Sequence, residues 1–178
     1  MKTHCMLPVI AVILASLLGG CASPTEVSSM ALGSIGTEKQ HAKSVSVSSG
    51  GGQETNPAWM SKVSDQDLAS AIEESIRQTK LFAGIVKLGD SDYHLNATIV
   101  NLSQPVMGFN LTVKTEILWT LTAKAGQKPV WQKTIRSEST KGAGDAFSFA
   151  ARVRITTEAA IKANINTAFR ELSQLKLE

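Results

Sequence analysis

Residues 109–124 constrain the fold more than any other stretch of the chain, because residues fit for a protein core alternate there with polar ones. The core-type set is Phe109, Leu111, Val113, Thr115, Ile117, Trp119, Leu121 and Ala123. A period of two predicts a β-strand with one face in a core. Sixteen extended residues would span ~50 Å, so we expect a bend or bulge within this strand.

Two further strands are predicted on either side of this segment. Residues 93–105 alternate in the same way and end near a proline. Residues 125–129 contain glycine and proline and predict a turn. Residues 130–139 then return as a strand antiparallel to the long one.

Two helices are predicted from the spacing of apolar residues. Ser64, followed three residues later by Asp67, resembles a capping box and should begin a helix that ends before Gly84. Residues 146–175 keep their apolar side chains on one side at helical spacing. Asp145 is the predicted N-cap of this second helix.

The order β-α-β-β-β-α predicts an α+β fold, a two-layer sandwich with two helices on one face of a mainly antiparallel sheet. Its first strand would be residues 44–48, where serine and valine alternate. Since that strand is only weakly indicated, the predicted sheet has four strands with it and three without it. All nine aromatic residues lie from Trp59 to Phe169, so we expect the core there.

The first 21 residues have the order of a bacterial export signal. Residues 6–18 are apolar apart from Pro8 and Ser16, and 13 residues fall short of the ~20 that span a bilayer. The run ends in small residues and a cysteine: Leu18, Gly19, Gly20 and Cys21. This ending resembles the lipobox of bacterial lipoproteins. The resemblance implies that residues 1–20 are a cleaved signal peptide and that Cys21 carries diacylglycerol and a further acyl chain such as palmitate.

The lipobox resemblance also implies a location in the cell. Ala22 stands where an aspartate would favour the inner membrane, so we expect the outer membrane, with the chain facing the periplasm. Several acyl chains, each gaining ~0.8 kcal/mol per buried methylene, can hold a protein on a membrane without a spanning helix. Cleavage discards Cys5 and lipidation uses Cys21, so no thiol remains for a disulfide or a metal site. We expect no metal and no cofactor.

Residues 21–56 are expected to be a tether between the lipid anchor and the domain. Residues 22–56 contain eight serines, five glycines and no aromatic residue among 35 positions. Such a composition buries too little surface to offset the entropy of ordering the chain. Residues 57–178, about 120 in number, are then the globular domain and are sufficient for independent stability.

The one histidine-containing cluster of the predicted domain is a weak metal candidate. Asp90, Asp92 and His94 occupy alternate positions and would share one face of a strand. A metal site needs further ligands, so a polar turn entering a strand is the better interpretation.

Residues 142–147 resemble the anion-hole signature of ribokinase-like sugar kinases, but that family needs about twice this chain length. We interpret them as a turn in which glycines permit the bend, Asp145 caps the following helix and Phe147 packs. No other cluster predicts a reaction, so we expect no enzymatic activity.

Four basic residues are expected to gather where the last strand turns into the final helix: Arg136, Lys141, Arg152 and Arg154. Such a patch could bind an anionic partner such as a lipid headgroup or lipopolysaccharide. A solvated face is the alternative. The formal net charge of +3 is too small for the basic footprint of a nucleic-acid-binding protein, so we expect no nucleic acid.

The layout as a whole resembles small outer-membrane lipoproteins of the YajG-like and LptE-like type. The resemblance rests on the lipobox, the long alternating strand from Phe109, the turn at Gly126 and the stretch from Gly142 through Phe147 into an Ala- and Asn-rich helix. We expect an accessory factor for envelope assembly or transport that binds an envelope protein. Our hypothesis is that it binds through a sheet edge or the polar sheet face. The alternative is a lipid-handling auxiliary lipoprotein of an ABC-type lipid transport system, marked by an apolar cavity between helices and sheet.

Overall fold

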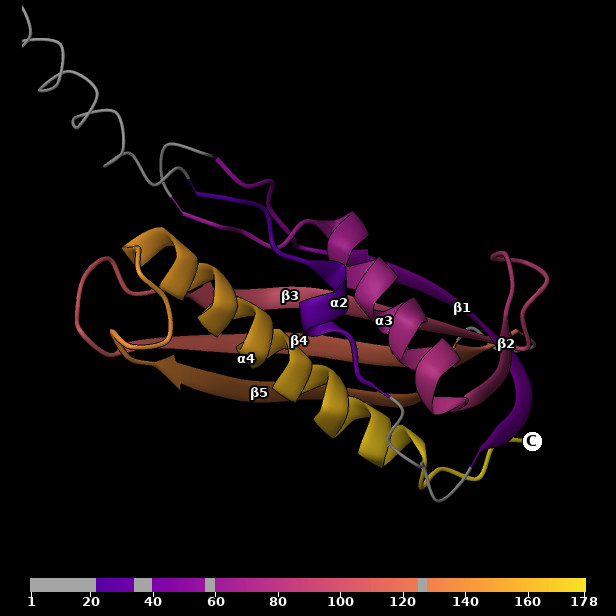
Figure 1. Ribbon diagram of the computed structural model, residues 1–178. Coiled ribbons are helices and arrows are strands. Elements are labelled where there is room, and N and C mark those ends of the chain that lie inside the picture. The colour runs from indigo at the N-terminus through magenta and orange to yellow at the C-terminus, as the bar shows by residue number, and fades with distance from the viewer. Residues whose placement is uncertain (1–21, 34–39, 57–59, 125–127) are drawn as a thin grey trace, which may run out of the picture.

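Five strands form one sheet in the part of the chain that the computed structural model describes, residues 22–33, 40–56, 60–124 and 128–178. The strands are β1 (His41–Gly50), β2 (Phe82–Ile85), β3 (Tyr93–Ser103), β4 (Leu111–Ala123) and β5 (Pro129–Lys141). The helices are α2 (Val27–Met30), α3 (Asp65–Thr79) and α4 (Phe149–Leu172). Figure 1 shows α3 and α4 on one face of the sheet, with α2 between them. The α+β prediction is therefore confirmed, whereas the predicted signal peptide and Cys21 lie outside the described residues.

The prediction of a mainly antiparallel sheet with three or four strands is partly wrong. The spatial order is β2-β1-β3-β4-β5, and only the pairs β3–β4 and β4–β5 are antiparallel. Residues 44–48 do form a strand, but β1 lies inside the sheet and runs parallel to both neighbours, with Val45 opposite Tyr93. The physical reason is α3, which connects β1 to β2, since parallel strands require such a crossover.

The first predicted helix ends before Gly84, as expected, and the unpredicted strand β2 follows it. Ser64 is the N-cap, as predicted, and its Oγ accepts a hydrogen bond from the N–H of Asp67 at 3.1 Å. The helix ends at Thr79 because Lys80 adopts a left-handed conformation with φ 53°. The chain then continues directly into β2.

The second predicted helix begins later than expected. Ser148, not Asp145, is the N-cap of α4, and its Oγ accepts from the N–H of Ala151 at 3.1 Å. Asp145 instead closes the preceding turn, where its carboxylate accepts from the N–H of Gly142 at 2.7 Å. We had expected Phe147 to pack, but its side chain is exposed to solvent.

The long strand is shorter than its sequence pattern. β4 begins at Leu111, and the preceding Phe109 is exposed, contrary to its predicted place in the core. The expected irregularity is present as a shift of register against β5 between Leu121 and Thr122.

The core fills the space between the sheet and the helices. Its largest fully buried side chains come from both layers and include Leu68, Ile72, Leu95, Trp119, Ile161 and Phe169. The polar residue Asn164 of α4 is also fully buried. Its Oδ1 accepts from Trp119 Nε1 at 2.8 Å and its Nδ2 donates to the carbonyl of Ile135 at 2.8 Å, which fixes α4 on β4 and β5.

Candidate functional site

Residues 22–33, which we call the N-terminal segment, are part of the folded domain. The sequence had suggested a tether here, yet several of these side chains are buried: Ala22, Thr25, Met30, Ala31 and Leu32. The short helix α2 contacts both α3 and α4. Apolar residues spaced along the segment supply enough burial to order it, and this outweighs its serine-rich composition. The residue after the predicted lipidation site is therefore already part of the fold.

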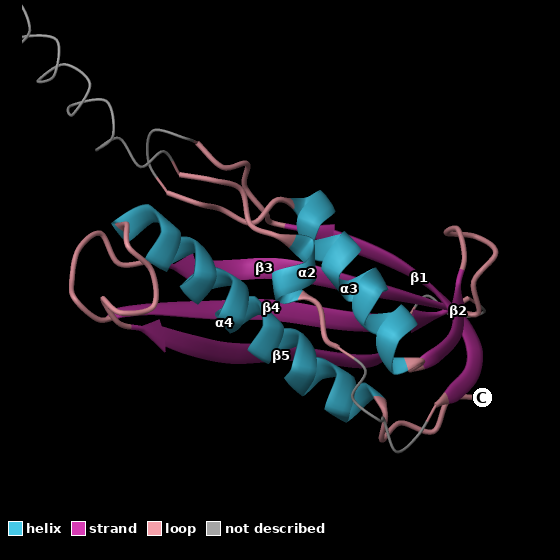
Figure 2. Cartoon of the chain, viewed as in Figure 1, coloured by secondary structure: helices cyan, strands magenta, loops and turns pink. Residues whose placement is uncertain are grey.

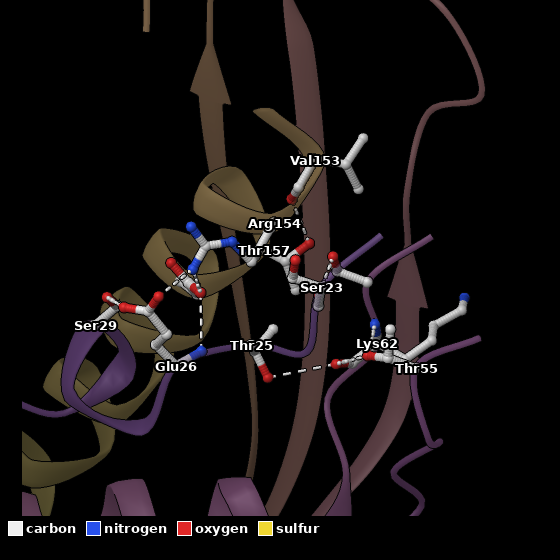
Figure 3. A network of polar contacts seen from close by, with 11 residues as sticks. Ser23, Thr25, Glu26, Ser29, Thr55, Lys62, Val153, Arg154 and Thr157 are labelled. Atoms are coloured by element: carbon white, nitrogen blue, oxygen red, sulfur yellow. Dashed lines mark hydrogen bonds and ion pairs between the residues drawn. The ribbon is translucent and has the colours of Figure 1, made fainter. Parts of the chain in front are cut away.

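A polar network attaches the N-terminal segment to α4 (Figure 3). Arg154 Nη1 lies 2.8 Å from Glu26 Oε1 and 3.1 Å from Glu158 Oε1. Oε1 of Glu158 also accepts from the backbone N–H of Glu26 at 2.9 Å. Burial raises the pKa of Glu158 above its usual value, although the Glu26 N–H and the Arg154 guanidinium both favour its charged form.

A second set of hydrogen bonds fixes the beginning of the segment. Ser61 Oγ donates to the carbonyl of Ser23, and Thr25 Oγ1 donates to the carbonyl of Lys62 at 3.3 Å. The carbonyl of Ser61 in turn accepts from Gln104 Nε2 at 2.7 Å. Ser23 is thus linked through one residue to the loop that follows β3.

The predicted lipid anchor must leave the domain close to this point. Cys21 precedes Ser23 by two residues, and two residues span at most ~7 Å of extended chain. Leu18, Gly19, Gly20 and Cys21 themselves lie outside the described residues. The geometry therefore places a short attachment, in place of a long tether, between the predicted acylated residue and the fold.

The four basic residues of the predicted patch do not form one surface. Arg136 lies on β5 and pairs across the sheet with Glu116 of β4, on the face away from the helices, at 2.9 Å. Arg154 lies on α4 in the network described above. Lys141 and Arg152 are at the turn into α4, where Lys141 pairs with Asp145 at 3.3 Å. Sequence spacing could not separate these faces, because the turn reverses the chain between them.

Two residues of the weak metal candidate, Asp92 and His94, form hydrogen bonds with hydroxyl groups of β1. Both ring nitrogens of His94 lie 2.9 Å from a serine hydroxyl, Nδ1 from Ser46 and Nε2 from Ser48. The Asp92 carboxylate accepts from the N–H and hydroxyl of Ser44, and these bonds lower the pKa of Asp92. Among the described residues, no group of three or more His, Cys, Asp or Glu could hold a metal ion.

These serines belong to the open face, by which we mean the side of the sheet away from α3 and α4. Figure 2 shows the two long helices on the opposite side. The face is rich in hydroxyl and amide groups, several of them bonded to one another, as Thr120 is to Gln132 at 3.0 Å and Thr112 is to Thr140 at 2.8 Å. Leu118 lies within the same row of β4.

Sequence reasoning missed Glu26, Ser61, Gln104 and Glu158. One signal was present for Glu158, because Arg154 and Glu158 are four residues apart and form an ion pair along the helix. The other contacts join residues that are distant in the chain and leave no local pattern.

Several solved structures are similar to this chain, and the two with TM-scores of 0.56 and 0.50 share its fold. A Xanthomonas campestris protein described by the family model DUF330 is 13% identical, with 85% of this chain and 93% of that chain covered and a TM-score of 0.56. The hypothetical protein CT253 from Chlamydia trachomatis is 7% identical over 74% of this chain and 93% of that chain, with a TM-score of 0.50. Uncharacterized lipoprotein B from Nitrosomonas europaea is 13% identical over 78% of this chain and 86% of that chain, with a TM-score of 0.49.

These similarities concern the fold alone. No family model matches the chain, and no curated protein matches its sequence. The narrower resemblance to the YajG-like and LptE-like groups stays a prediction. Within the described ranges, no helix has the length and apolar character needed to cross a bilayer.

Proposed function

We propose that this chain is a lipid-anchored lipoprotein of the bacterial outer membrane that faces the periplasm and acts by binding an envelope protein, without catalysing a reaction. The observation that carries the proposal is the docking of the N-terminal segment. Ala22 is buried and Ser61 Oγ donates to the carbonyl of Ser23, so the chain is part of the fold from the residue that follows the cysteine of the lipobox-like sequence.

The anchor is tested by the chemistry of the mature N-terminus. Mass spectrometry of the chain recovered from bacterial membranes should find Cys21 as the first residue, with diacylglycerol on its sulfur and an acylated amine. Cys21→Ala should abolish processing and lipid attachment, whereas Cys5→Ala should change neither, because residue 5 is discarded. Normal processing and membrane fractionation of Cys21→Ala would contradict the anchor.

The open face is the part of the fold that suits a protein partner. The helices cover the other face, and the described surface of β1, β3, β4 and β5 offers hydroxyl and amide groups around Leu118. Such groups can exchange their mutual hydrogen bonds for bonds to a partner at small net cost. The Arg136–Glu116 ion pair lies on the same face, so these two charges balance each other there.

The open face is tested by site-specific photocrosslinking in cells. A photoreactive residue replacing Thr120 on the open face should form an adduct with one envelope protein, and Leu118→Arg should abolish it. The same probe at Lys162, an exposed position on α4, is the matched control and should form none. Adducts from Lys162 alone, or from neither position, would contradict binding through the open face.

The lipid-handling alternative has less support from the fold. It requires an apolar cavity between helices and sheet, and Trp119 and Phe169 are among the large side chains that fill this space. We therefore propose binding of a protein partner, with the lipid anchor as the contact to the membrane.

A further inference from the structure

Four large apolar side chains are exposed at one end of the sheet. Val106, Met107 and Phe109 lie between β3 and β4, and Phe147 lies between β5 and α4. Phe109 is 85% exposed and Phe147 is 106% exposed. We call residues 104–110 and 142–148 the apolar loops. Clustered exposed apolar residues of this size mark an interaction site more often than a free surface.

The two apolar loops are neighbours in space. Leu111 at the start of β4 is opposite Lys141 at the end of β5, so both loops leave the sheet at the same end. Arg152 Nη1 donates to the carbonyl of Phe109 at 3.0 Å and joins the first loop to the first turn of α4. Figure 2 shows both loops extending beyond this end of the strands.

Positive charge lies directly behind the apolar tips. Lys141 and Arg152 flank the second loop. Lys141 is paired with Asp145 of that loop at 3.3 Å, whereas Arg152 takes part in none of the ion pairs among the described residues and supplies the net positive charge. Apolar tips backed by Lys and Arg are typical of surfaces that enter a bilayer, because the tips reach the acyl chains while the cations stay near the phosphates.

The predicted lipid anchor leaves the fold at this same end. Gln104, the first residue of the apolar loops, donates to the carbonyl of Ser61, and Ser61 donates to the carbonyl of Ser23. Cys21 is only two residues further, within ~7 Å of extended chain. An acylated Cys21 would therefore hold the apolar loops close to the membrane.

We propose that the apolar loops insert Phe109 and Phe147 into the bilayer to which Cys21 is attached, with Lys141 and Arg152 facing lipid phosphates. This inference rests on the proposed lipid anchor. A membrane accounts for the position of the anchor beside the loops, which a protein partner would leave unexplained. The sheet then stands away from the membrane, with its opposite end in the periplasm.

The test uses the chain from Cys21 onward, which contains every described residue and a single cysteine. Coupling of its thiol to a maleimide lipid attaches the chain to vesicles of phosphatidylethanolamine and phosphatidylglycerol. Phe147→Trp places a reporter on the apolar loops. Leu88→Trp is the matched control, because Leu88 is 72% exposed and lies between β2 and β3, at the opposite end of β3.

Brominated acyl chains should quench the emission that Phe147→Trp adds to the parent chain, and this emission should shift to the blue on coupling. The emission added by Leu88→Trp should be unchanged. Phe109→Trp is a second reporter and should behave like Phe147→Trp. The insertion would be overturned if, for each of the three variants, the added emission were the same in brominated and unbrominated lipid. Quenching of Leu88→Trp alone would also overturn it.

Chemical coupling replaces acylation in the cell, so the two proposals can fail separately. Quenching in vesicles without acylation of Cys21 in cells contradicts the anchor. The loops could then enter a bilayer, but no anchor would hold them at the membrane in the cell. Acylation in cells without quenching in vesicles contradicts the insertion alone. A crosslink from residue 147 to an envelope protein, with no quenching, would assign the apolar loops to a protein surface and overturn their insertion.

Discussion

The backbone N–H of Glu26 donates to Oε1 of Glu158 at 2.9 Å, although 132 positions separate the two residues in the chain. Glu158 is 3% exposed, so this bond lies where the N-terminal segment meets α4. It makes the residues after the predicted lipidation site part of the fold, and the orientation proposed for the domain depends on it.

Arg154→Met should destabilise the protein by about 2–3 kcal/mol, measured by urea unfolding. Removal of one partner from a buried ion pair typically costs ~3–5 kcal/mol, and we expect less because the Glu26 side chain is 60% exposed. Arg77→Met is the matched control, since Arg77 pairs with Glu73 on an exposed helix surface and should cost less than ~0.5 kcal/mol. Equal effects of the two substitutions would contradict the role given to Arg154.

Glu158→Gln should change the dependence of stability on pH. Burial raises the pKa of Glu158 above its usual 4.5, so the folded chain holds this proton more tightly than the unfolded chain. Its contribution to stability is therefore full below the unfolded pKa and is lost as pH rises through the raised folded pKa. Glutamine keeps an acceptor for the Glu26 N–H but cannot ionise.

The free energy of unfolding of Glu158→Gln, relative to wild type, should accordingly increase between about pH 4 and pH 7. Denaturation curves at a series of pH values measure this difference directly. If this difference in the free energy of unfolding stays constant or decreases over this range, burial does not raise the pKa of the Glu158 carboxyl.

Met30→Ala should cost about 2–5 kcal/mol, because it removes a fully buried side chain from the core and leaves a cavity. Ser28→Ala, at an exposed position of the same short helix, should change stability by less than ~0.5 kcal/mol. Thermal and urea unfolding of both variants provide the comparison. A negligible effect of Met30→Ala would mean that the N-terminal segment is detached in solution.

Asn164→Ala should cost about 2–4 kcal/mol. It leaves the Trp119 indole N–H and the Ile135 carbonyl without their partner in the core, and each unsatisfied buried group costs ~1–3 kcal/mol. Asn166→Ala, two positions away at a half-buried site, should stay within ~0.5 kcal/mol of wild type. A similar loss for both asparagines would show that the effect comes from the helix and not from this network.

The sequence pattern predicted the elements whose burial follows a simple period. β3, β4 and α3 were found close to their bounds because their apolar residues recur every two or every four positions. The place of β1 inside the sheet could not be found in this way. Its serines resemble those of a linker. Their hydroxyl groups form hydrogen bonds with side chains 46 to 48 positions away, as Ser48 does with His94.

The candidate site was predictable only in part. The lipobox-like run ending at Cys21 is local and legible in the sequence, whereas the docking of the N-terminal segment depends on Glu158, Ser61 and Gln104, which are distant in the chain. Phe109 and Phe147 were assigned to the core because large apolar residues are usually buried. Their exposure became visible only when both loops were found beyond the end of the sheet.

Amide hydrogen exchange of residues 22–33 tests most directly whether the chain is folded from the residue after Cys21. The N–H groups of Glu26 and Leu32 donate to Glu158 and to the buried Ser75, so they should exchange slowly, with protection close to that of α4. Exchange of these amides at the rate of an unfolded peptide would mean that the segment is a tether, and it would contradict the fixed position of the anchor beside the apolar loops.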